Sequence, residues 1–155
     1  MTATLLRHLV LLCALLMCAA PVPALAASAA MSQASQSLLS KGMAAADAKR
    51  AQRFFEQAIV ADPANAAAFS ALGDLYGKQA KTDLARKYYR LALDIDPLEP
   101  SALAGAAAID IADGKTDAAR DRLRKLKASC PACRQTNDIE RRLKPGAAAP
   151  SLPHP

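Results

Sequence analysis

Apolar side chains in the middle of the chain recur at helical spacing. Phe69, Leu72 and Tyr76 are three and four residues apart, so they share one face of a helix. A second stretch repeats this spacing with small residues at two of its positions, and its members are Ala85, Tyr89, Ala92 and Leu93. The pattern predicts two helices whose apolar faces pack together as a hairpin.

Prolines divide the chain into equal parts. Pro63, Pro97 and Pro131 lie 34 residues apart, and each closes a stretch with a similar pattern of small, large and aromatic residues. Because proline cannot continue a helix, each one marks the end of a hairpin. A supersecondary unit repeated at this period indicates stacked helical hairpins, which usually serve as binding surfaces. The predicted units are residues 32–65, 66–99 and 100–133.

The middle unit resembles the tetratricopeptide repeat at all eight of its signature positions. The matching residues are Phe69, Leu72, Gly73, Tyr76, Ala85, Tyr89, Ala92 and Pro97. The resemblance implies an all-α fold, a right-handed superhelical stack of helix-turn-helix repeats with a C-terminal capping helix.

The outer units match the repeat less fully. In the first unit, Leu39 stands at the family's glycine position and Gly42 at a position for a large residue. In the third unit, Ala107 and Asp110 replace the glycine and the tyrosine. Atypical end repeats are expected in a stack, because one of their faces has no neighbour.

The first 26 residues have the pattern of a cleavable secretory signal. Arg7 precedes an apolar run over residues 9–20, and residues 24–26 form a small-residue cleavage site. About a dozen apolar residues fall short of the roughly 20 that a membrane-spanning helix needs. Lipoprotein processing requires a small residue before the cysteine, and neither Cys13 nor Cys18 follows one. We therefore expect a periplasmic or secreted protein.

Cleavage after Ala26 changes the charge of the chain. The full sequence carries 20 Lys and Arg against 14 Asp and Glu, and loss of Arg7 leaves 19 against 14, a net charge of +5. Such a basic chain would otherwise suggest nucleic acid as a partner, but export argues against it. Residues 27–31 are predicted to form a short linker before the repeats.

Beyond the repeats, residues 134–144 are predicted to form a capping helix. Asn137 is its candidate N-cap, and Ile139 and Leu143 share a face that would cover the exposed end of the third unit. Residues 145–155 are rich in proline and alanine, and they are predicted to be disordered.

A run of basic residues follows the second half of the third unit and continues toward the C-terminus. Its members are Arg120, Arg122, Arg124, Lys125, Lys127, Arg141, Arg142 and Lys144. Such a run is usually a solvated face. In an envelope compartment it could also make weak contact with anionic phospholipid or cell-wall polymer.

Cys130 and Cys133 form a Cys-Pro-Ala-Cys motif, the one constellation with candidate chemistry. In an oxidising compartment a structural disulfide is expected. The alternative is a redox or haem-handling pair, since a helix N-terminus can lower the first thiol's pKa, and the motif is somewhat similar to that of cytochrome c maturation proteins. A zinc site needs four ligands, and the mature chain offers these cysteines and His154. We expect no metal, no other cofactor and no enzyme activity.

The resemblance also implies where a partner binds. The family's concave face is lined by the first helix of each unit, and the corresponding positions here include Gln36, Ser40, Met43, Ser70, Asp74, Lys78, Ser101 and Ile111. These side chains are mostly small or polar. Members that grip a terminal carboxylate use Lys, Asn and Arg on this face, but Ser40, Asp74 and Ala108 stand at the key Asn position here, so such a clamp is not expected. An extended segment or amphipathic helix of a protein partner is therefore expected to bind there.

The leading functional prediction is an adaptor or scaffold for protein interactions in the cell envelope. The alternative is a thiol-active accessory factor, with Cys130 and Cys133 acting in the maturation of another envelope protein such as a c-type cytochrome.

Overall fold

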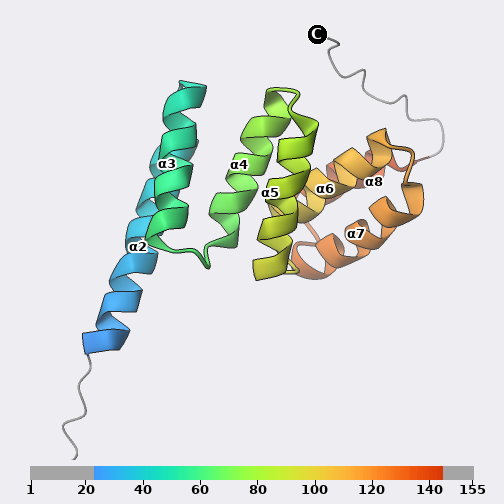
Figure 1. The fold of residues 1–155 in the computed structure, drawn as a ribbon. Coiled ribbons are helices and arrows are strands. Elements are labelled where there is room, and N and C mark those ends of the chain that lie inside the picture. Colours follow the sequence, from blue (N-terminus) through green and yellow to red (C-terminus); the bar gives the residue numbers. More distant parts are fainter. Residues whose placement is uncertain (1–22, 145–155) are drawn as a thin grey trace, which may run out of the picture. The chain divides into compact units, whose positions relative to one another are not determined.

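A computed structural model describes residues 23–144, with side chains from residue 27 onward. The chain divides into two units, Met1–Ala30 and Met31–Pro155. The regular structure of the described residues is entirely helical (Figure 1). The helices are α2 (Pro23–Met43), α3 (Ala48–Ala61), α4 (Ala66–Lys78), α5 (Thr82–Ile95), α6 (Pro100–Ala112), α7 (Thr116–Ser129) and α8 (Arg134–Arg142).

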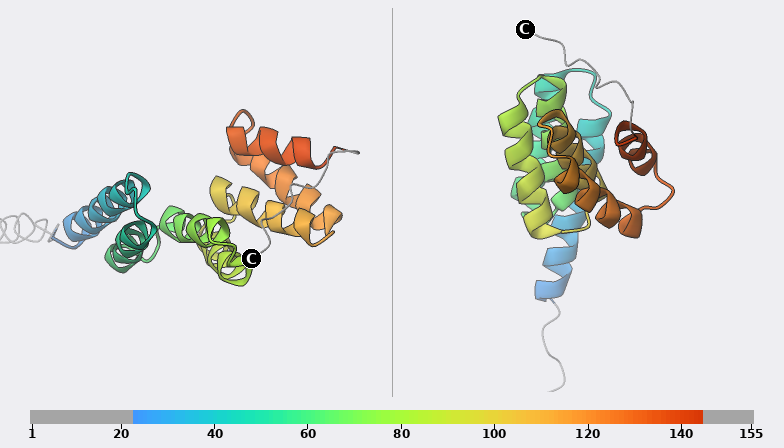
Figure 2. Two further views of the ribbon diagram at one scale, coloured as in Figure 1. Left: turned by 90° about the horizontal axis from the view of Figure 1, so that it is seen from above. Right: turned by 90° about the vertical axis from the view of Figure 1, so that its right-hand side faces the viewer.

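Helix boundaries repeat with the predicted 34-residue period. Helices α3, α5 and α7 begin at Ala48, Thr82 and Thr116, and the first helices of the later units, α4 and α6, begin at Ala66 and Pro100. Helix α4 packs against α5, α6 packs against α7, and α6 joins the two hairpins by contacting α4 and α5 (Figure 2). The prediction of an all-α stack of helical hairpins is confirmed.

The C-terminal helix α8 continues the same series. It begins at Arg134, one period after Pro100, and it packs on α6 and α7. Helix α8 therefore occupies the place that the first helix of a fourth unit would take, and it covers the end of the third unit with Ile139, which is buried.

The turns that connect one unit to the next share one conformation. Each starts at the C-cap of a second helix (Asp62, Asp96 or Cys130), continues with proline, and ends at the N-cap of the next helix (Asn65, Glu99 or Cys133). In all three, the N–H of the last residue donates to the carbonyl oxygen of the first, at 3.1, 3.1 and 3.4 Å. The Cys-Pro-Ala-Cys motif is thus the third copy of an inter-repeat turn.

Two of these N-caps also connect successive first helices. The Asn65 amide donates to the Ser35 hydroxyl of α2 at 2.7 Å, and the Glu99 carboxylate accepts from the Ser70 hydroxyl of α4 at 2.5 Å. Both serines are buried. A buried polar group that finds its partner in only one arrangement fixes how the two helices approach each other.

The apolar core of the part of the chain from Met31 onward consists of two clusters. One spans α3 to α6, and the other joins α6, α7 and α8; their largest members are Phe55, Leu72, Tyr76 and Tyr89 in the first, and Leu103, Leu126 and Ile139 in the second. In the first cluster the Tyr89 ring lies between two glycines on neighbouring helices. A Cβ atom would come within 2.5 Å of this ring at Gly73 of α4 and within 2.2 Å at Gly105 of α6.

The first unit obtains the same close approach from a glycine one helical turn away from the family position. Leu39 stands in that position and packs against the core. Gly42 lies against the Phe55 ring, where a Cβ atom would come within 2.4 Å. Gly42, which the repeat pattern marks as a departure, therefore performs the packing role of the family glycine.

Two expectations about the ends of the repeat region are wrong. Residues 27–31 are not a linker, because they lie inside α2. Asn137 is not an N-cap, because α8 begins directly after the turn and Cys133 takes that place. The signal peptide expected at residues 1–26 lies largely outside the described residues, since only Pro23 onward is described, and the tail expected at residues 145–155 lies wholly outside them.

Candidate partner-binding site

Of the eight residues expected to line a partner groove, some have exposed side chains and others are covered by neighbouring parts of the fold. Ser70 is only 1% exposed and donates to Glu99, so it cannot line a groove. Ile111 packs, half-buried, against the cluster that α8 completes. The expectation for Ser70 is wrong because Glu99 covers its side chain, which a helical pattern within one unit does not reveal, whereas Ile111 keeps part of its side chain exposed.

The Asp74 carboxylate is engaged by another side chain of the fold. The Tyr89 hydroxyl donates to its carboxylate at 2.7 Å, and the carboxylate is half-buried between α4 and α5. Burial raises the pKa of Asp74 above its ordinary value, and the negative charge of Glu99 acts in the same direction, although the Tyr89 hydrogen bond and Lys78 oppose both. Burial also raises the pKa of the Tyr89 phenol, so this hydroxyl stays protonated and remains a donor.

The remaining expected residues have side chains that are not buried. Gln36, Ser40 and Lys78 are exposed, Met43 is 74% exposed, and Ser101 is half-buried. The four exposed side chains come from α2 and from the last turn of α4. We call these four residues the α2–α4 edge, and they present one cation, two polar groups and one large apolar side chain.

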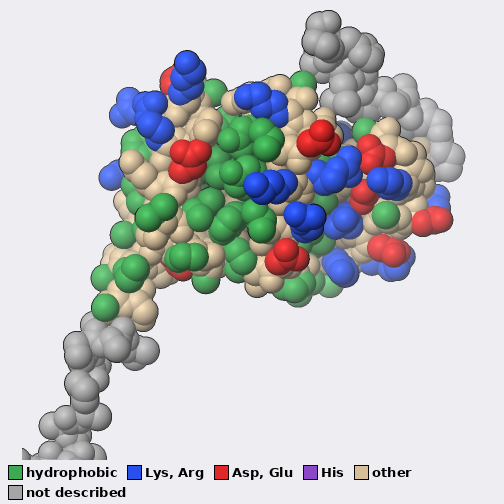
Figure 3. Space-filling model, in the orientation of Figure 1, with side chains coloured by type: hydrophobic (Ala, Val, Ile, Leu, Met, Phe, Trp, Pro, Cys, Tyr) green, Lys and Arg blue, Asp and Glu red, His purple; other side chains and the backbone are tan. Residues whose placement is uncertain are grey.

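A hollow of about 580 Å³ lies on the opposite series of helices, between α5 and α7. Its floor is apolar and consists of Leu93, Leu103, Ala106 and Ile109. Six cations line it, namely Arg86, Lys87, Arg90, Lys115, Arg122 and Lys125, against the three carboxylates of Asp83, Asp94 and Asp110. Lys and Arg side chains gather over this part of the surface in Figure 3. We call this site the α5–α7 hollow.

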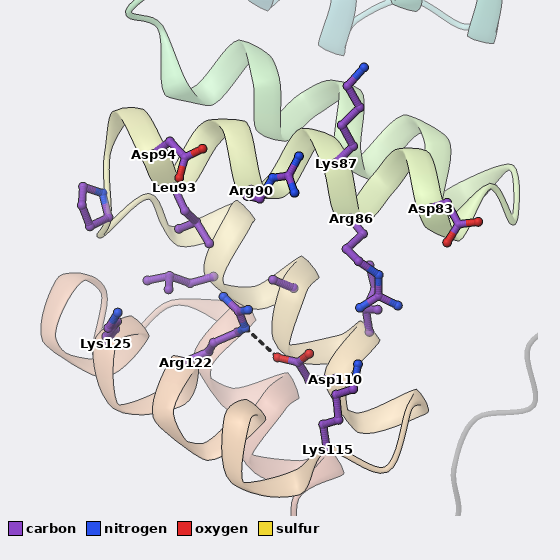
Figure 4. Close-up of a pocket in the computed structure, with 14 residues that line it drawn as sticks. Asp83, Arg86, Lys87, Arg90, Leu93, Asp94, Asp110, Lys115, Arg122 and Lys125 are labelled. Atoms are coloured by element: carbon purple, nitrogen blue, oxygen red, sulfur yellow. Dashed lines mark hydrogen bonds and ion pairs between the residues drawn. The ribbon is translucent and has the colours of Figure 1, made fainter.

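One buried ion pair forms part of the wall of the hollow. Arg122 of α7 donates to Asp110 of α6 at 2.6 Å, and the Asp110 carboxylate is 7% exposed (Figure 4). Asp110 stands at the position that is tyrosine in the repeat family, so in this unit an ion pair replaces an aromatic contact between the two helices of the hairpin.

Other cations of the hollow are partly neutralised at its rim. Asp113 accepts from Arg86 at 3.0 Å and from Lys115 at 2.9 Å. The Lys115 hydrogen bond, with Arg86 nearby, holds the pKa of Asp113 below its usual range. Within residues 23–144, Arg90 and Lys125 form no ion pair, and both are exposed. The hollow therefore keeps positive charge available on both of its walls.

Sequence reasoning identified only part of this hollow. Arg122 and Lys125 belong to the basic run, but Arg86 and Arg90 lie on another helix. A sequence pattern that could have predicted this wall is the four-residue spacing of Arg86, Arg90 and Asp94. This spacing places the three side chains on one face of α5 beside Leu93.

The two cysteines are free thiols in this structure, and both are half-buried. The Cys133 thiol donates to the Cys130 carbonyl oxygen at 3.1 Å and lies 3.3 Å from the Thr136 hydroxyl. Burial raises the pKa of Cys133, but hydrogen bonds with Cys130 and Thr136 and with backbone N–H groups of α8 outweigh it, so the pKa is lowered overall. The contact with Cys133 raises the pKa of Cys130. The predicted disulfide stays a prediction.

Two other kinds of site are absent from the described residues. No cluster of three or more His, Cys, Asp or Glu side chains suited to a metal ion occurs within residues 23–144. None of the helices described here combines the length and the apolar character needed to cross a membrane.

Comparison with known proteins agrees with the hairpin geometry. The sequence profile of the tetratricopeptide repeat family matches residues 66–97. The chain contains a tetratricopeptide repeat. Among solved structures, the Arabidopsis OM64 TPR domain is similar with a TM-score of 0.62 and 21% sequence identity, over 73% of this chain and 96% of that domain. No curated protein shows significant sequence similarity to the chain. The tetratricopeptide fold thus covers the neighbouring hairpins as well as the matched repeat.

Proposed function

We propose that this tetratricopeptide repeat protein is an exported adaptor of the cell envelope, which binds a segment of a partner protein and has no catalytic activity of its own. The observation that carries the proposal is the stack itself: helices repeat in a 34-residue register, and hydrogen bonds to buried serines join successive first helices. Repeat stacks of this kind work as extended binding surfaces. The α2–α4 edge is the part of that surface with side chains free for a partner.

Crosslinking in the intact envelope, followed by mass spectrometry, tests the adaptor function. The variant Ser40→Arg/Lys78→Glu changes two exposed residues of the α2–α4 edge, and Lys49→Glu changes an exposed lysine of α3 as the matched control. We expect the edge variant to lose crosslinked partners that the control retains. An unchanged set of partners in the edge variant, with helical content preserved, would refute binding at this edge.

A thiol-active accessory factor is the second candidate, and the turn geometry favours it. Cys130 is the C-cap of α7 and Cys133 is the N-cap of α8, so the dipole of each helix acts on a different thiol. The negative end of α7 disfavours the Cys130 thiolate, while the positive end of α8 favours the Cys133 thiolate. The attacking thiol of this candidate is therefore the second cysteine, whereas sequence reasoning expects the first.

The redox step of this candidate is a thiol–disulfide exchange with the partner protein. The Cys133 thiolate attacks one sulfur of a disulfide in the partner protein, and the partner's other sulfur leaves as a thiolate. Cys130 then attacks the Cys133 sulfur, which releases the partner's second thiol and closes a Cys130–Cys133 disulfide. Two electrons and the two cysteine protons pass to the partner, and a dithiol reductant of the compartment restores the pair.

Serine variants separate the two candidates. A thiol factor loses function with Cys133→Ser, and Cys130→Ser traps a mixed disulfide with its partner that is visible on a non-reducing gel. An adaptor retains both its function and its partners when both cysteines are serine. Trapped species with Cys130→Ser would therefore favour thiol chemistry over a structural disulfide.

A further inference from the structure

We propose that the α5–α7 hollow is a second partner-binding site, which takes an acidic segment of a protein that also carries apolar side chains. This inference adds a surface to the proposed adaptor function, and it does not depend on the α2–α4 edge. It rests on the shape, the apolar floor and the unequal charge of the hollow.

The shape of the hollow fits a short length of polypeptide. Asp83 and Asp94, near the two ends of α5, both line it. At 1.5 Å per residue they are about 16 Å apart along the helix axis. An extended chain rises about 3.3 Å per residue, so about five residues span this length. The apolar floor, with Leu93 and Ile109 half-buried and not fully covered, gains stability when a partner's apolar side chain covers it.

The charge of the hollow selects an acidic segment. Asp83 and Asp94 lie near the ends of α5, whereas cations occupy the middle (Figure 4). Arg90 on α5 and Lys125 on α7 stand on opposite walls, and neither has an ion-pair partner among the described residues. Carboxylates of a bound segment would meet both, which gives such a segment an electrostatic advantage over a basic one.

Two other cations of the hollow are unsuitable as probe or control. Arg122 already holds the buried Asp110, so its replacement would damage the fold and is unsuitable as a probe. Lys87 lies on the same helix as Arg90 but points away from α6 and α7 in Figure 4, and its ammonium group lies 5.9 Å from the centre of the Tyr88 ring. Lys87 still lines the hollow, so the control is Lys49→Glu, which reverses the charge of an exposed lysine of α3 outside the hollow.

The test measures binding of labelled nine-residue peptides to the full chain by fluorescence anisotropy. One peptide alternates Glu and Leu, the second alternates Lys and Leu, and the third alternates Glu and Ser. We expect the Glu–Leu peptide to bind most tightly and to weaken as salt is raised. Its Kd should rise about tenfold in Arg90→Glu/Lys125→Glu, in line with charge reversal at an interface, and should stay within about twofold in Lys49→Glu.

Several outcomes would overturn the proposal. Equal binding of the Glu–Leu and Lys–Leu peptides removes the charge argument, and equal binding of the Glu–Leu and Glu–Ser peptides removes the role of the apolar floor. Displacement of the peptide by millimolar inorganic phosphate indicates a small-anion site. If Arg90→Glu/Lys125→Glu reduces binding to phosphatidylglycerol vesicles and leaves the peptide Kd unchanged, the occupant is a lipid surface. Peptide binding by the edge variant Ser40→Arg/Lys78→Glu is measured in parallel. An unchanged Kd in this variant shows that the hollow binds independently of the α2–α4 edge.

Discussion

At the scale of single residues, Tyr89 organises the middle of the stack. Its ring lies against Gly73 and Gly105, and its hydroxyl donates to Asp74. One side chain of α5 thus holds α4 and α6 at close range, because neither neighbour has a Cβ atom at the point of contact. This arrangement makes two positions on different helices sensitive to the addition of a single methyl group.

The variant Gly105→Ala should destabilise the protein, because its Cβ would lie 2.2 Å from the Tyr89 ring. Overpacking of this kind costs about 1–3 kcal/mol, which exceeds the gain of about 0.5–1 kcal/mol from replacing glycine within a helix. Gly77→Ala is the matched control, because its nearest contact is the Tyr89 hydroxyl at an ordinary 3.7 Å. Urea unfolding measures both. A Gly105→Ala variant as stable as Gly77→Ala would contradict the close packing.

Asp74 should give the protein a characteristic pH dependence. Its pKa is raised in the folded state, so the folded protein binds the proton more tightly than the unfolded chain. Its contribution to stability is therefore greatest below the unfolded pKa of about 3.9, and is lost as pH rises through the folded pKa. Asp74→Asn keeps an acceptor for the Tyr89 hydroxyl without the charge.

Thermal unfolding of wild type and Asp74→Asn from pH 3 to pH 8 measures this effect. We expect the variant to be at least as stable as wild type at neutral pH, with its relative advantage shrinking as the pH falls toward about 4 and changing little below that. A stability difference that does not change with pH would show that the Asp74 charge carries no cost in the folded protein.

At the scale of helices, contacts between hairpins differ along the stack while the register stays constant. The N-caps Asn65 and Glu99 hold a serine of the preceding first helix, whereas Cys133 holds none and instead contacts Thr136 of its own helix. Within the third hairpin, the Asp110–Arg122 pair substitutes for an aromatic residue. The end of the stack therefore depends on polar contacts where its centre depends on ring packing.

Arg122→Ala should destabilise the third hairpin strongly. The variant leaves the Asp110 carboxylate buried without a partner, and removal of one member of a buried pair costs about 3–5 kcal/mol. Arg124→Ala, on the same helix, removes an exposed pair with Asp121 and should change stability by less than about 0.5 kcal/mol. Chemical denaturation compares the two. The double variant Asp110→Leu/Arg122→Leu should recover much of the lost stability. A double variant as unstable as Arg122→Ala would argue against a buried-charge cost.

At the scale of the whole molecule, the export proposal makes a prediction about the N-terminus. Cleavage after Ala26 would leave a protein that starts at Ala27, inside the helix that begins at Pro23, with a net charge of +5. Intact mass and N-terminal sequencing of the protein recovered from the envelope fraction measure this directly. A chain that retains residues 1–26, or one that starts at a lipid-modified Cys18, would contradict the proposed processing.

Local patterns in the chain are enough to predict the helical hairpins and their period. Phe69, Leu72 and Tyr76 define a stripe on one helix, and prolines at a fixed interval end the second helix of each unit; both are local constraints that act within a few residues. For the same reason the all-α stack could be predicted, and so could a C-terminal helix from residue 134, one period after Pro100. The helical state of residues 27–31 was missed because their small side chains resemble a linker, and Asn137 was mistaken for an N-cap because the capping-box spacing lies inside α8.

Contacts between repeats determine which side chains remain exposed for a partner. Ser70 has the spacing of a groove residue, yet it is buried because Glu99, 29 positions later in the chain, reaches it across the stack. Gly105 matches no signature position, yet it receives the Tyr89 ring. The α5–α7 hollow likewise exists only because α5 packs against α6 of the next repeat, which itself packs against α7, so its charge is a sum over residues that no local pattern connects.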